Sequence, residues 1–206
     1  MKIIIIDFDG TIIDSNHAKK SILREFIKEN YHIDIDKKIS IFESQRLTRY
    51  ELITLAKNSK IDSYEKDKID QQINNCVINS KVDPFIYELF KYCSKNKIKI
   101  ILVSNTPHKS LISILNILNI SHYFYKVFGK NISGNKINTF SKIIKNENVK
   151  PVEILSVGDN IEDYFASKIN NIPFHGISDQ SLSILKGKIP ISNNLKGVFK
   201  SLKNSS

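Results

Sequence analysis

The sequence predicts an α/β protein: a doubly wound parallel sheet, with a small helical domain inserted after the first strand. Short runs of Ile, Leu and Val recur without polar alternation, as is typical of strands buried on both faces. Between these runs, apolar residues recur at helical spacing, which indicates alternating strands and helices. The 206 residues suit one domain of average size, or a core with a small insert.

The first predicted strand covers Ile3 to Ile6 and stops at the sequence Asp-Phe-Asp-Gly-Thr. Asp7 and Asp9 therefore stand at the carboxyl end of a buried strand, where open α/β sheets hold their chemistry. Gly10 allows the tight turn that such an ending needs. Because two acids at this place are costly unless a cation compensates them, the pair indicates a catalytic metal site rather than a solvated turn.

The chain from 16 to 81 is predicted to form a small bundle of helices. Apolar residues recur there at helical spacing, with polar breaks around 34–38 and 57–63. Three groups show this spacing: Ile22, Leu23, Phe26 and Ile27; Leu52, Ile53, Leu55 and Ala56; and Ile69, Ile73, Cys76 and Val77. The predicted domains are a catalytic core of residues 1–15 and 82–206 and a helical insert of residues 16–81.

Strands and helices alternate in the rest of the chain. We expect strands at 99–103, 153–157, 172–177 and 188–191, and helices at 85–92, after Pro107, after Lys136, from Asp163 and at 198–202. The strand at 99–103 runs into Ser-Asn-Thr-Pro, and Pro107 suits the first turn of the helix that follows. The strand at 153–157 ends at Gly-Asp-Asn.

Composition favours a folded cytoplasmic enzyme. Hydrophobic residues at 41% and charged residues at 25% are ordinary for a globular chain. Cys76 and Cys93 form no metal-ligand pattern, so two reduced thiols are expected. The first apolar run is too short for a signal peptide or a membrane span. The net charge of +10 comes from lysines scattered through every segment, which indicates a solvated surface able to attract an anionic substrate.

The predicted strand ends bring a set of polar residues to one edge of the sheet. These are Asp7, Asp9, Ser104, Asp159 and Asp163, with Lys136 at the start of a helix between them. The carboxyl ends of parallel strands meet at the same edge, so these side chains should lie close together. Carboxylates without His or Cys suit a hard ion, Mg²⁺ above all, and the hydroxyl and lysine beside it suit a phosphoryl group.

The order of these motifs resembles the haloacid dehalogenase superfamily of phosphohydrolases, in the type with a helical cap inserted after the first strand of a Rossmann-like core. The resemblance covers essentially the whole chain and points to members such as phosphoglycolate phosphatase and β-phosphoglucomutase. It implies that Asp7 is a nucleophile that forms an aspartyl-phosphate. Asp9 would be the general acid/base and would bind Mg²⁺ through its backbone carbonyl.

The resemblance also assigns the remaining core residues. Thr11, Ser104 and the backbone amide of Asn105 would bind the phosphate, and Lys136 would neutralise charge on Asp7 and on the phosphoryl group. Asp159 would complete the metal site, together with Asp163 directly or through a water. Three of these residues have a plainer alternative: Ser104 as a helix N-cap, and Asp159 and Asp163 as helix-capping residues. Lys130 and Glu162 are the alternatives to Lys136 and Asp163, and the family spacing favours the latter two.

In the cap, Arg49 is the candidate substrate residue. It lies in the segment Gln-Arg-Leu-Thr-Arg-Tyr-Glu, where a guanidinium could grip a carboxylate or a second phosphate. The alternative is a surface arginine paired with Glu51 or Glu43. His17 follows the opening motif and could contact substrate, although a histidine that simply begins a helix is the plainer interpretation.

The predicted function is a Mg²⁺-dependent phosphatase whose partner is a small phosphorylated metabolite, such as a sugar phosphate, phosphoglycolate or a nucleotide. Asp9 disfavours the dehalogenase and phosphonatase branches, and Thr11 favours hydrolysis over the alternative, a sugar phosphomutase. A second alternative is a catalytically idle module for binding or regulation. The sequence has no basic groove with interleaved aromatic residues, which argues against nucleic acid as a partner. It gives no membrane segment and does not indicate an oligomeric state.

Overall fold

A computed structural model describes residues 1–35, 47–130, 132 and 134–204, and every structural statement below concerns these residues. The chain divides into two compact units. The first, called the core unit, comprises Met1–Asp14 and Lys81–Ser206. The second, called the insert unit, comprises Ser15–Ser80.

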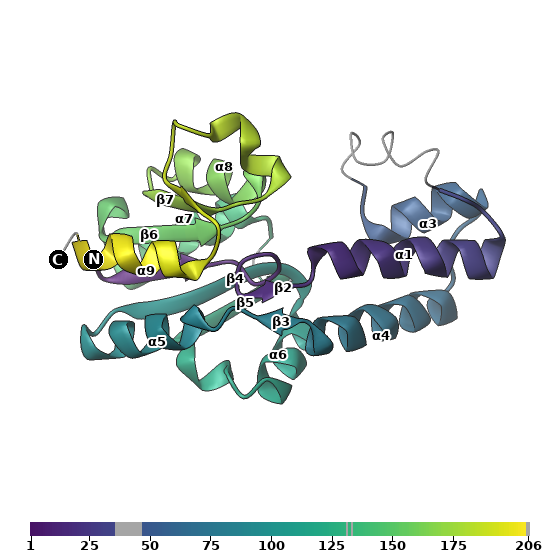
Figure 1. The fold of residues 1–206 in the computed structure, drawn as a ribbon, viewed down its shortest axis with the longest axis horizontal. Helices are drawn as coiled ribbons and strands as arrows, with labels where there is room; N and C mark the ends of the chain where they lie inside the picture. The colour runs from purple at the N-terminus through teal and green to yellow at the C-terminus, as the bar shows by residue number, and fades with distance from the viewer. Residues whose placement is uncertain (36–46, 131, 133, 205–206) are drawn as a thin grey trace. The chain divides into compact units, whose positions relative to one another are not determined.

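The core unit is built on a six-stranded sheet in the order β5-β4-β1-β6-β7-β8 (Figure 1). The strands are β1 (Ile3–Ile6), β4 (Lys99–Pro107), β5 (Lys126–Lys130), β6 (Ile154–Gly158), β7 (Phe174–Ile177) and β8 (Ile191–Ser192). All pairings in this sheet are parallel. The parallel sheet confirms the predicted α/β fold, and β1 occupies its centre between β4 and β6.

Helices cover both faces of this sheet. They are α5 (Phe85–Lys95), α6 (His108–Ile117), α7 (Lys136–Glu147), α8 (Ile161–Ile169) and α9 (Leu195–Asn204), with short 3₁₀ segments at Ser121–Tyr123, Pro151–Glu153 and Gln180–Leu185. Figure 1 shows α7 and α8 on one side of the sheet and α5 and α6 on the other. The sheet is therefore doubly wound, and its strands are screened from water on both faces.

Strand β1 is buried along its whole length because both of its faces meet apolar side chains. Ile3 and Ile5 belong to a cluster with strand residues of β4 and β6 and with α7 and α8 residues such as Phe140 and Ala166. Ile4 and Ile6 are equally buried, and by strand alternation they face the opposite helical layer. An unbroken run of isoleucine is thus the pattern that a central parallel strand requires.

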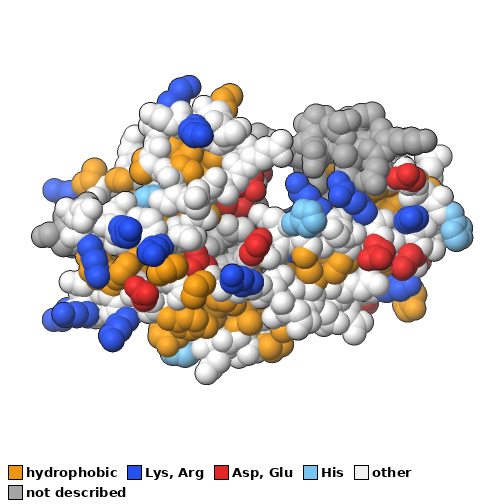
Figure 2. Space-filling view, viewed as in Figure 1, with side chains coloured by type: hydrophobic (Ala, Val, Ile, Leu, Met, Phe, Trp, Pro, Cys, Tyr) orange, Lys and Arg blue, Asp and Glu red, His pale blue; other side chains and the backbone are white. Residues whose placement is uncertain are grey.

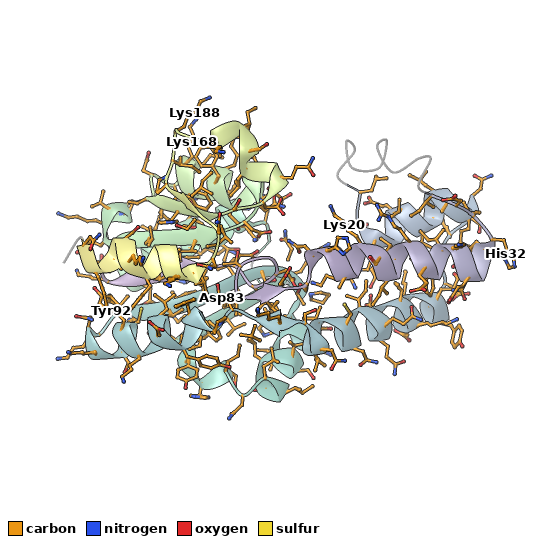
Figure 3. The ribbon with its side chains drawn as sticks, in the orientation of Figure 1. Lys20, His32, Asp83, Tyr92, Lys168 and Lys188 are labelled. Atoms are coloured by element: carbon orange, nitrogen blue, oxygen red, sulfur yellow. The ribbon has the colours of Figure 1, made fainter. Side chains whose placement is uncertain are left out.

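Asp83 joins the starts of two helices on the second face. Its carboxylate accepts hydrogen bonds from the backbone N–H of Phe85, at the start of α5, and of Leu195, at the start of α9 (2.9 and 2.8 Å). Figure 3 labels Asp83 beside these two helix ends. A negative charge there compensates the positive ends of both helix dipoles and caps groups that would otherwise be unsatisfied.

Three features of the core unit were missed or misplaced by the sequence prediction. Strand β5 was not predicted, because its sequence Lys-Val-Phe-Gly-Lys lacks a long apolar run and it lies at the edge of the sheet. The two-residue strands β2 (Ile13–Asp14) and β3 (Lys81–Val82) pair antiparallel and are too short to give a pattern. The strand predicted at 188–191 is confined to Ile191–Ser192.

The insert unit is helical in its described residues. It contains α1 (Asn16–Tyr31), α3 (Arg49–Lys57) and α4 (Ser63–Asn79), and capping boxes begin α3 at Thr48 and α4 at Asp62. One polar cluster ties the three helices together. Glu65 of α4 accepts hydrogen bonds from Lys57 of α3 (2.6 and 2.7 Å) and from the hydroxyl of Tyr31 of α1 (2.6 Å). These bonds, Lys57 first, lower the pKa of Glu65 to about 2.

We predict that Ile5→Ala lowers the free energy of unfolding by about 2–5 kcal/mol, because it leaves a cavity in the cluster between the sheet and α7. Ile5→Val should cost only about 0.5–1.5 kcal/mol. Urea denaturation measures both values. Ile117→Ala is the matched control, since Ile117 is 58% exposed and its truncation should change stability by less than about 0.5 kcal/mol. Equal losses for Ile5→Ala and Ile117→Ala would contradict the central place of β1.

Candidate active site

The loop after β1 is held in place by the backbone. The N–H of Asp7 donates to the carbonyl of Val157 on β6 (2.9 Å), so Asp7 continues the pairing of the strand. The chain then turns tightly, and the N–H groups of Ile12 and Ile13 both donate to the carbonyl of Phe8, whose ring is fully buried. Gly10 has a φ of 74°, as the turn requires. Asp7 and Asp9 therefore leave the sheet on a rigid loop.

Three carboxylates meet at the carboxyl edge of the sheet. Asp7 follows β1, Asp159 follows β6, and Asp163 lies in the first turn of α8. Each can offer an oxygen atom such that these atoms lie within 4.8 Å of one another, and all three side chains are buried. Gly158 permits this approach, because a Cβ atom there would stand 2.5 Å from the carboxyl carbon of Asp163.

Lys136 compensates part of this negative charge. It is the first residue of α7, whose N-cap is Asn135, and its Nζ donates to Asp7 Oδ1 (2.8 Å) and to Asp163 Oδ1 (2.6 Å). Burial alone would lower the pKa of Lys136. The charges and hydrogen bonds of Asp163 and Asp7 outweigh burial, so its pKa lies above the ordinary value and the side chain stays charged. Lys130, the alternative, is exposed at the end of β5.

One lysine does not balance three carboxylates. Burial raises the pKa of Asp7 well above its usual value, Lys136 opposes this rise, and the charges of Asp163 and Asp159 add to it. Burial, followed by the charges of Asp163 and Asp179, raises the pKa of Asp159 to about 7. A divalent cation bound to oxygen ligands would relieve this repulsion. The residues present therefore fit Mg²⁺, with Asp7, Asp159 and Asp163 as the side chains able to hold it.

The end of β4 supplies the hydroxyl groups of the site. Ser104 and Thr106 are both buried, whereas Asn105 between them is exposed. Ser104 lies within β4 and the N-cap of α6 is Pro107, so Ser104 is not a helix cap. The backbone N–H of Thr106 donates to Ser104 Oγ (3.0 Å), and Thr106 Oγ1 donates to Asp9 Oδ2 (2.7 Å).

Thr106 was missed by the sequence analysis. Its place two residues after the candidate Ser104 indicated that the two could share a face, but the sequence does not show the contact with Asp9. Ser181 was missed as well; its hydroxyl donates to the backbone carbonyl of Asp159 (3.0 Å) from a 3₁₀ segment that carries no sequence pattern.

The remaining candidate residues of the core unit are Thr11, Asn105 and Asp163. Thr11 is buried, and its hydroxyl donates to Asp159 Oδ1 (3.4 Å). The side-chain amide of Asn105 donates to Glu162 (3.0 Å), so Glu162 is directed to β4 while Asp163 joins the carboxylate cluster. Asp163 also accepts from the N–H of Asn160 (3.2 Å), which shows that it both caps α8 and belongs to the site.

The two cap candidates lie in the insert unit. Arg49 begins α3, and its guanidinium donates to Asp70 of α4 (2.9 Å), which also accepts from the hydroxyl of Tyr50 (2.6 Å). Glu51, one of the two partners suggested by the sequence, instead closes the capping box with Thr48. Glu43, the other, lies outside the described residues. His17 is exposed in the first turn of α1.

Three lysines of the core unit lie away from this edge. Lys91, Lys95 and Lys203 line a hollow of about 490 Å³ between α5 and α9, with Tyr92 and Phe199. Figure 2 shows Lys and Arg side chains over these helices. Helix α5 ends just before β4 begins, so its last lysines lie at the amino edge of the strands, opposite the carboxylate cluster.

The carboxyl edge of this parallel sheet therefore combines a buried aspartate cluster, a bridging lysine and strand-end hydroxyls. The chain matches the family of haloacid dehalogenase-like hydrolases over residues 4–177, and it belongs to that family. The predicted family and the prediction of a hydrolytic enzyme are thereby confirmed.

Individual relatives carry names within this family. The chain is 27% identical to the phosphoglycolate phosphatase of Aquifex aeolicus (strain VF5) over 184 residues, which cover 82% of this chain and 80% of that protein. A crystal structure assigned to a β-phosphoglucomutase from Thermotoga maritima superposes with a TM-score of 0.75 at 17% identity, covering 99% of both chains. One from Haemophilus somnus 129Pt, described as a predicted phosphoglycolate phosphatase, gives a TM-score of 0.74 at 19% identity, covering 98% of both.

None of the helices in the described residues has the length and apolar character needed to cross a bilayer.

We predict that Asp159→Asn stabilises the protein in EDTA near pH 8, by on the order of 1–3 kcal/mol. The raised pKa values of Asp7 and Asp159 mean that the metal-free folded state binds more protons than the unfolded chain between about pH 4 and pH 7. The free energy of unfolding of the metal-free protein therefore falls as the pH rises through that window. Removing one carboxylate should make this loss of stability smaller. Thermal unfolding at about pH 4 and pH 8 measures the difference.

The same substitution should remove the stabilisation that Mg²⁺ gives the wild type. Asp14→Asn is the control, because Asp14 is an exposed acid on β2. A metal-free Asp159→Asn protein that is less stable than the wild type near pH 8 would contradict the assigned repulsion.

Proposed function

We propose that this protein is a Mg²⁺-dependent phosphatase that hydrolyses a small phosphomonoester through an aspartyl-phosphate on Asp7. The observation that carries the proposal is Lys136 Nζ bound to both Asp7 and Asp163 inside a buried group of three carboxylates. This arrangement suits the approach of an anionic phosphoryl group to a carboxylate nucleophile, because a fixed cation lies beside the attacking oxygen.

In the first step, a carboxylate oxygen of Asp7 bonds to phosphorus and the bond from phosphorus to the ester oxygen breaks. Asp9 gives its proton to the departing oxygen, which leaves as an alcohol. Lys136 neutralises charge on Asp7 and on the phosphoryl oxygens, and the hydroxyl of Ser104 donates to one of them. Mg²⁺, when bound by Asp7, Asp159 and Asp163 and the backbone carbonyl of Asp9, would supply further charge neutralisation.

In the second step, water attacks phosphorus and gives a proton to Asp9, and the bond between phosphorus and Asp7 breaks. Inorganic phosphate leaves, and both aspartates return to their starting states. Asp9 therefore acts first as acid and then as base. Its hydrogen bond from Thr106 supports this role, because it fixes the side chain on the loop that carries Asp7.

The named relatives support the substrate class. The Aquifex aeolicus protein is a phosphoglycolate phosphatase, and the Thermotoga maritima structure is assigned to a sugar phosphomutase. We therefore propose a sugar phosphate, phosphoglycolate or a nucleotide as the substrate. Hydrolysis is preferred to phosphate transfer within a sugar because the opening motif ends in Thr11, at a position where mutases of this cap type often carry an apolar residue.

We predict that Asp7→Asn lowers kcat for phosphate release at least about 10³-fold, and that Asp9→Asn lowers it about 10²- to 10⁴-fold. EDTA should abolish the wild-type activity and Mg²⁺ should restore it. The assay is phosphate release from a panel of sugar phosphates, phosphoglycolate and nucleoside monophosphates. Asp14→Asn is the matched control and should keep full activity, because Asp14 is an exposed acid in the same part of the chain.

Two other results would redirect the proposal. Conversion of one sugar phosphate isomer into another, seen by phosphorus NMR without phosphate release, would establish the mutase. A folded wild type that neither releases phosphate nor isomerises any member of the panel would favour the idle binding module.

We further propose that Arg49 recognises the substrate's second anionic group. Arg49→Ala should raise KM for the preferred substrate about 10-fold or more and leave kcat for p-nitrophenyl phosphate nearly unchanged. Loss of the partly exposed pair with Asp70 should cost less than about 1 kcal/mol of stability, which thermal unfolding would verify. An unchanged KM would exclude Arg49 from the site.

A further inference from the structure

Strand β4 is irregular where it reaches the candidate active site. Val103 pairs with Phe128 of β5, and Pro107 pairs with Lys130, so the pairing shifts between these two positions. The intervening residues of β4 form a bulge, which is how strands redirect side chains near active sites. Gly129 allows β5 to approach this bulge: a Cβ atom there would stand 2.8 Å from the carbonyl oxygen of Thr106 and 2.5 Å from the Cα of His108.

Thr106 is the last residue of this bulge and forms two hydrogen bonds of different kinds. Its backbone N–H donates to Ser104 Oγ (3.0 Å), and its side-chain hydroxyl donates to Asp9 Oδ2 (2.7 Å). The second bond joins residues 97 positions apart and is short, as expected for a hydroxyl that donates to a carboxylate. Thr106 is buried, and Asp9 is only partly so.

The type of residue suits a fixed hydrogen bond. A threonine is branched at Cβ and has few accessible χ1 rotamers, so its hydroxyl is held in one direction more firmly than that of serine. Because the bulge is packed against Gly129, the backbone that carries this hydroxyl is itself restrained. The Thr106 hydroxyl that reaches Asp9 is therefore preorganised by β4 and its packing against the edge strand β5, and not by the loop on which Asp9 stands.

We propose that Thr106 is the positioning residue of the general acid/base. Its side chain fixes the rotamer of Asp9, and its backbone orients the hydroxyl of Ser104, so the proton donor and a phosphate-binding group share one support. This inference rests on the proposed function, because Thr106 acts through Asp9. Proton transfer is sensitive to displacements of a fraction of an ångström, so freeing the Asp9 side chain should weaken acid and base catalysis selectively.

The test compares leaving groups. An alkyl phosphate needs Asp9 to protonate its poor leaving oxygen, whereas 2,4-dinitrophenyl phosphate departs without a proton. Thr106→Val keeps the shape and removes the hydroxyl. It should lower kcat/KM for the alkyl phosphate about 10²-fold, and that for the dinitrophenyl ester less than about 3-fold.

A pre-steady-state measurement sharpens this test. With 2,4-dinitrophenyl phosphate, Thr106→Val should release one equivalent of dinitrophenolate per enzyme in a burst, followed by slow turnover. The reason is that hydrolysis of the aspartyl-phosphate still needs Asp9 as a base. Such a burst reports a slowed second step, which general damage to the fold would not produce.

Thr106→Ser is the matched control, since it keeps the hydroxyl and should recover most of the activity on the alkyl phosphate. Thr106→Ala serves as a second variant without the hydroxyl should Thr106→Val not fold. An equal loss for both leaving groups, or no loss for either, would overturn the role of Thr106 while leaving the proposed function intact. A wild type without Mg²⁺-dependent phosphatase activity would overturn the proposed function, and this inference with it.

Discussion

The buried contact of Lys136 with Asp7 and Asp163 is the interaction on which the arrangement of the core unit depends. Three carboxylates in so small a space repel one another, and the raised pKa values of Asp7 and Asp159 express that repulsion. One ammonium group reduces the repulsion without cancelling it. The divalent cation proposed above would compensate the remaining negative charge, so the electrostatic cost of the folded state lies at the same residues as the proposed chemistry.

The architecture of the core unit brings these charged groups together. Asp7 and Asp159 must leave neighbouring parallel strands at the same edge, and the pairing of β1 with β6 achieves this. Asp163 and Lys136 come from the first turns of α8 and α7, which pack together on one face of the sheet. Gly158 leaves room for the carboxylate of Asp163, because a side chain at this position would clash with it. The hydrophobic core below the edge holds these elements rigidly, so that like charges cannot simply move apart.

Much of this site was predictable because its residues stand next to strong patterns. Asp7, Ser104 and Asp159 each follow a run of apolar residues that reads plainly as a buried strand. Lys136 required the spacing of a known family, since a lysine among so many carries no signal of its own. Thr106 and Ser181 could not be predicted, because their roles depend on contacts that the sequence does not show. A bulge brings Thr106 to Asp9, and a 3₁₀ turn brings Ser181 to Asp159. Strand β5 was also not predicted, since an edge strand needs fewer apolar residues than a central one.

The place of the insert in the chain has a consequence for how the protein is made. Strand β1 pairs with residues of β4 and β6 that follow it by roughly a hundred positions or more, whereas the insert unit is one continuous stretch. During synthesis, β1 leaves the ribosome long before either of its neighbours exists, and the helices of the insert can form first. An unpaired run of four isoleucines must therefore stay in solution until the sheet closes around it. The residue that carries the proposed chemistry, Asp7, belongs to the segment that waits longest for its partners.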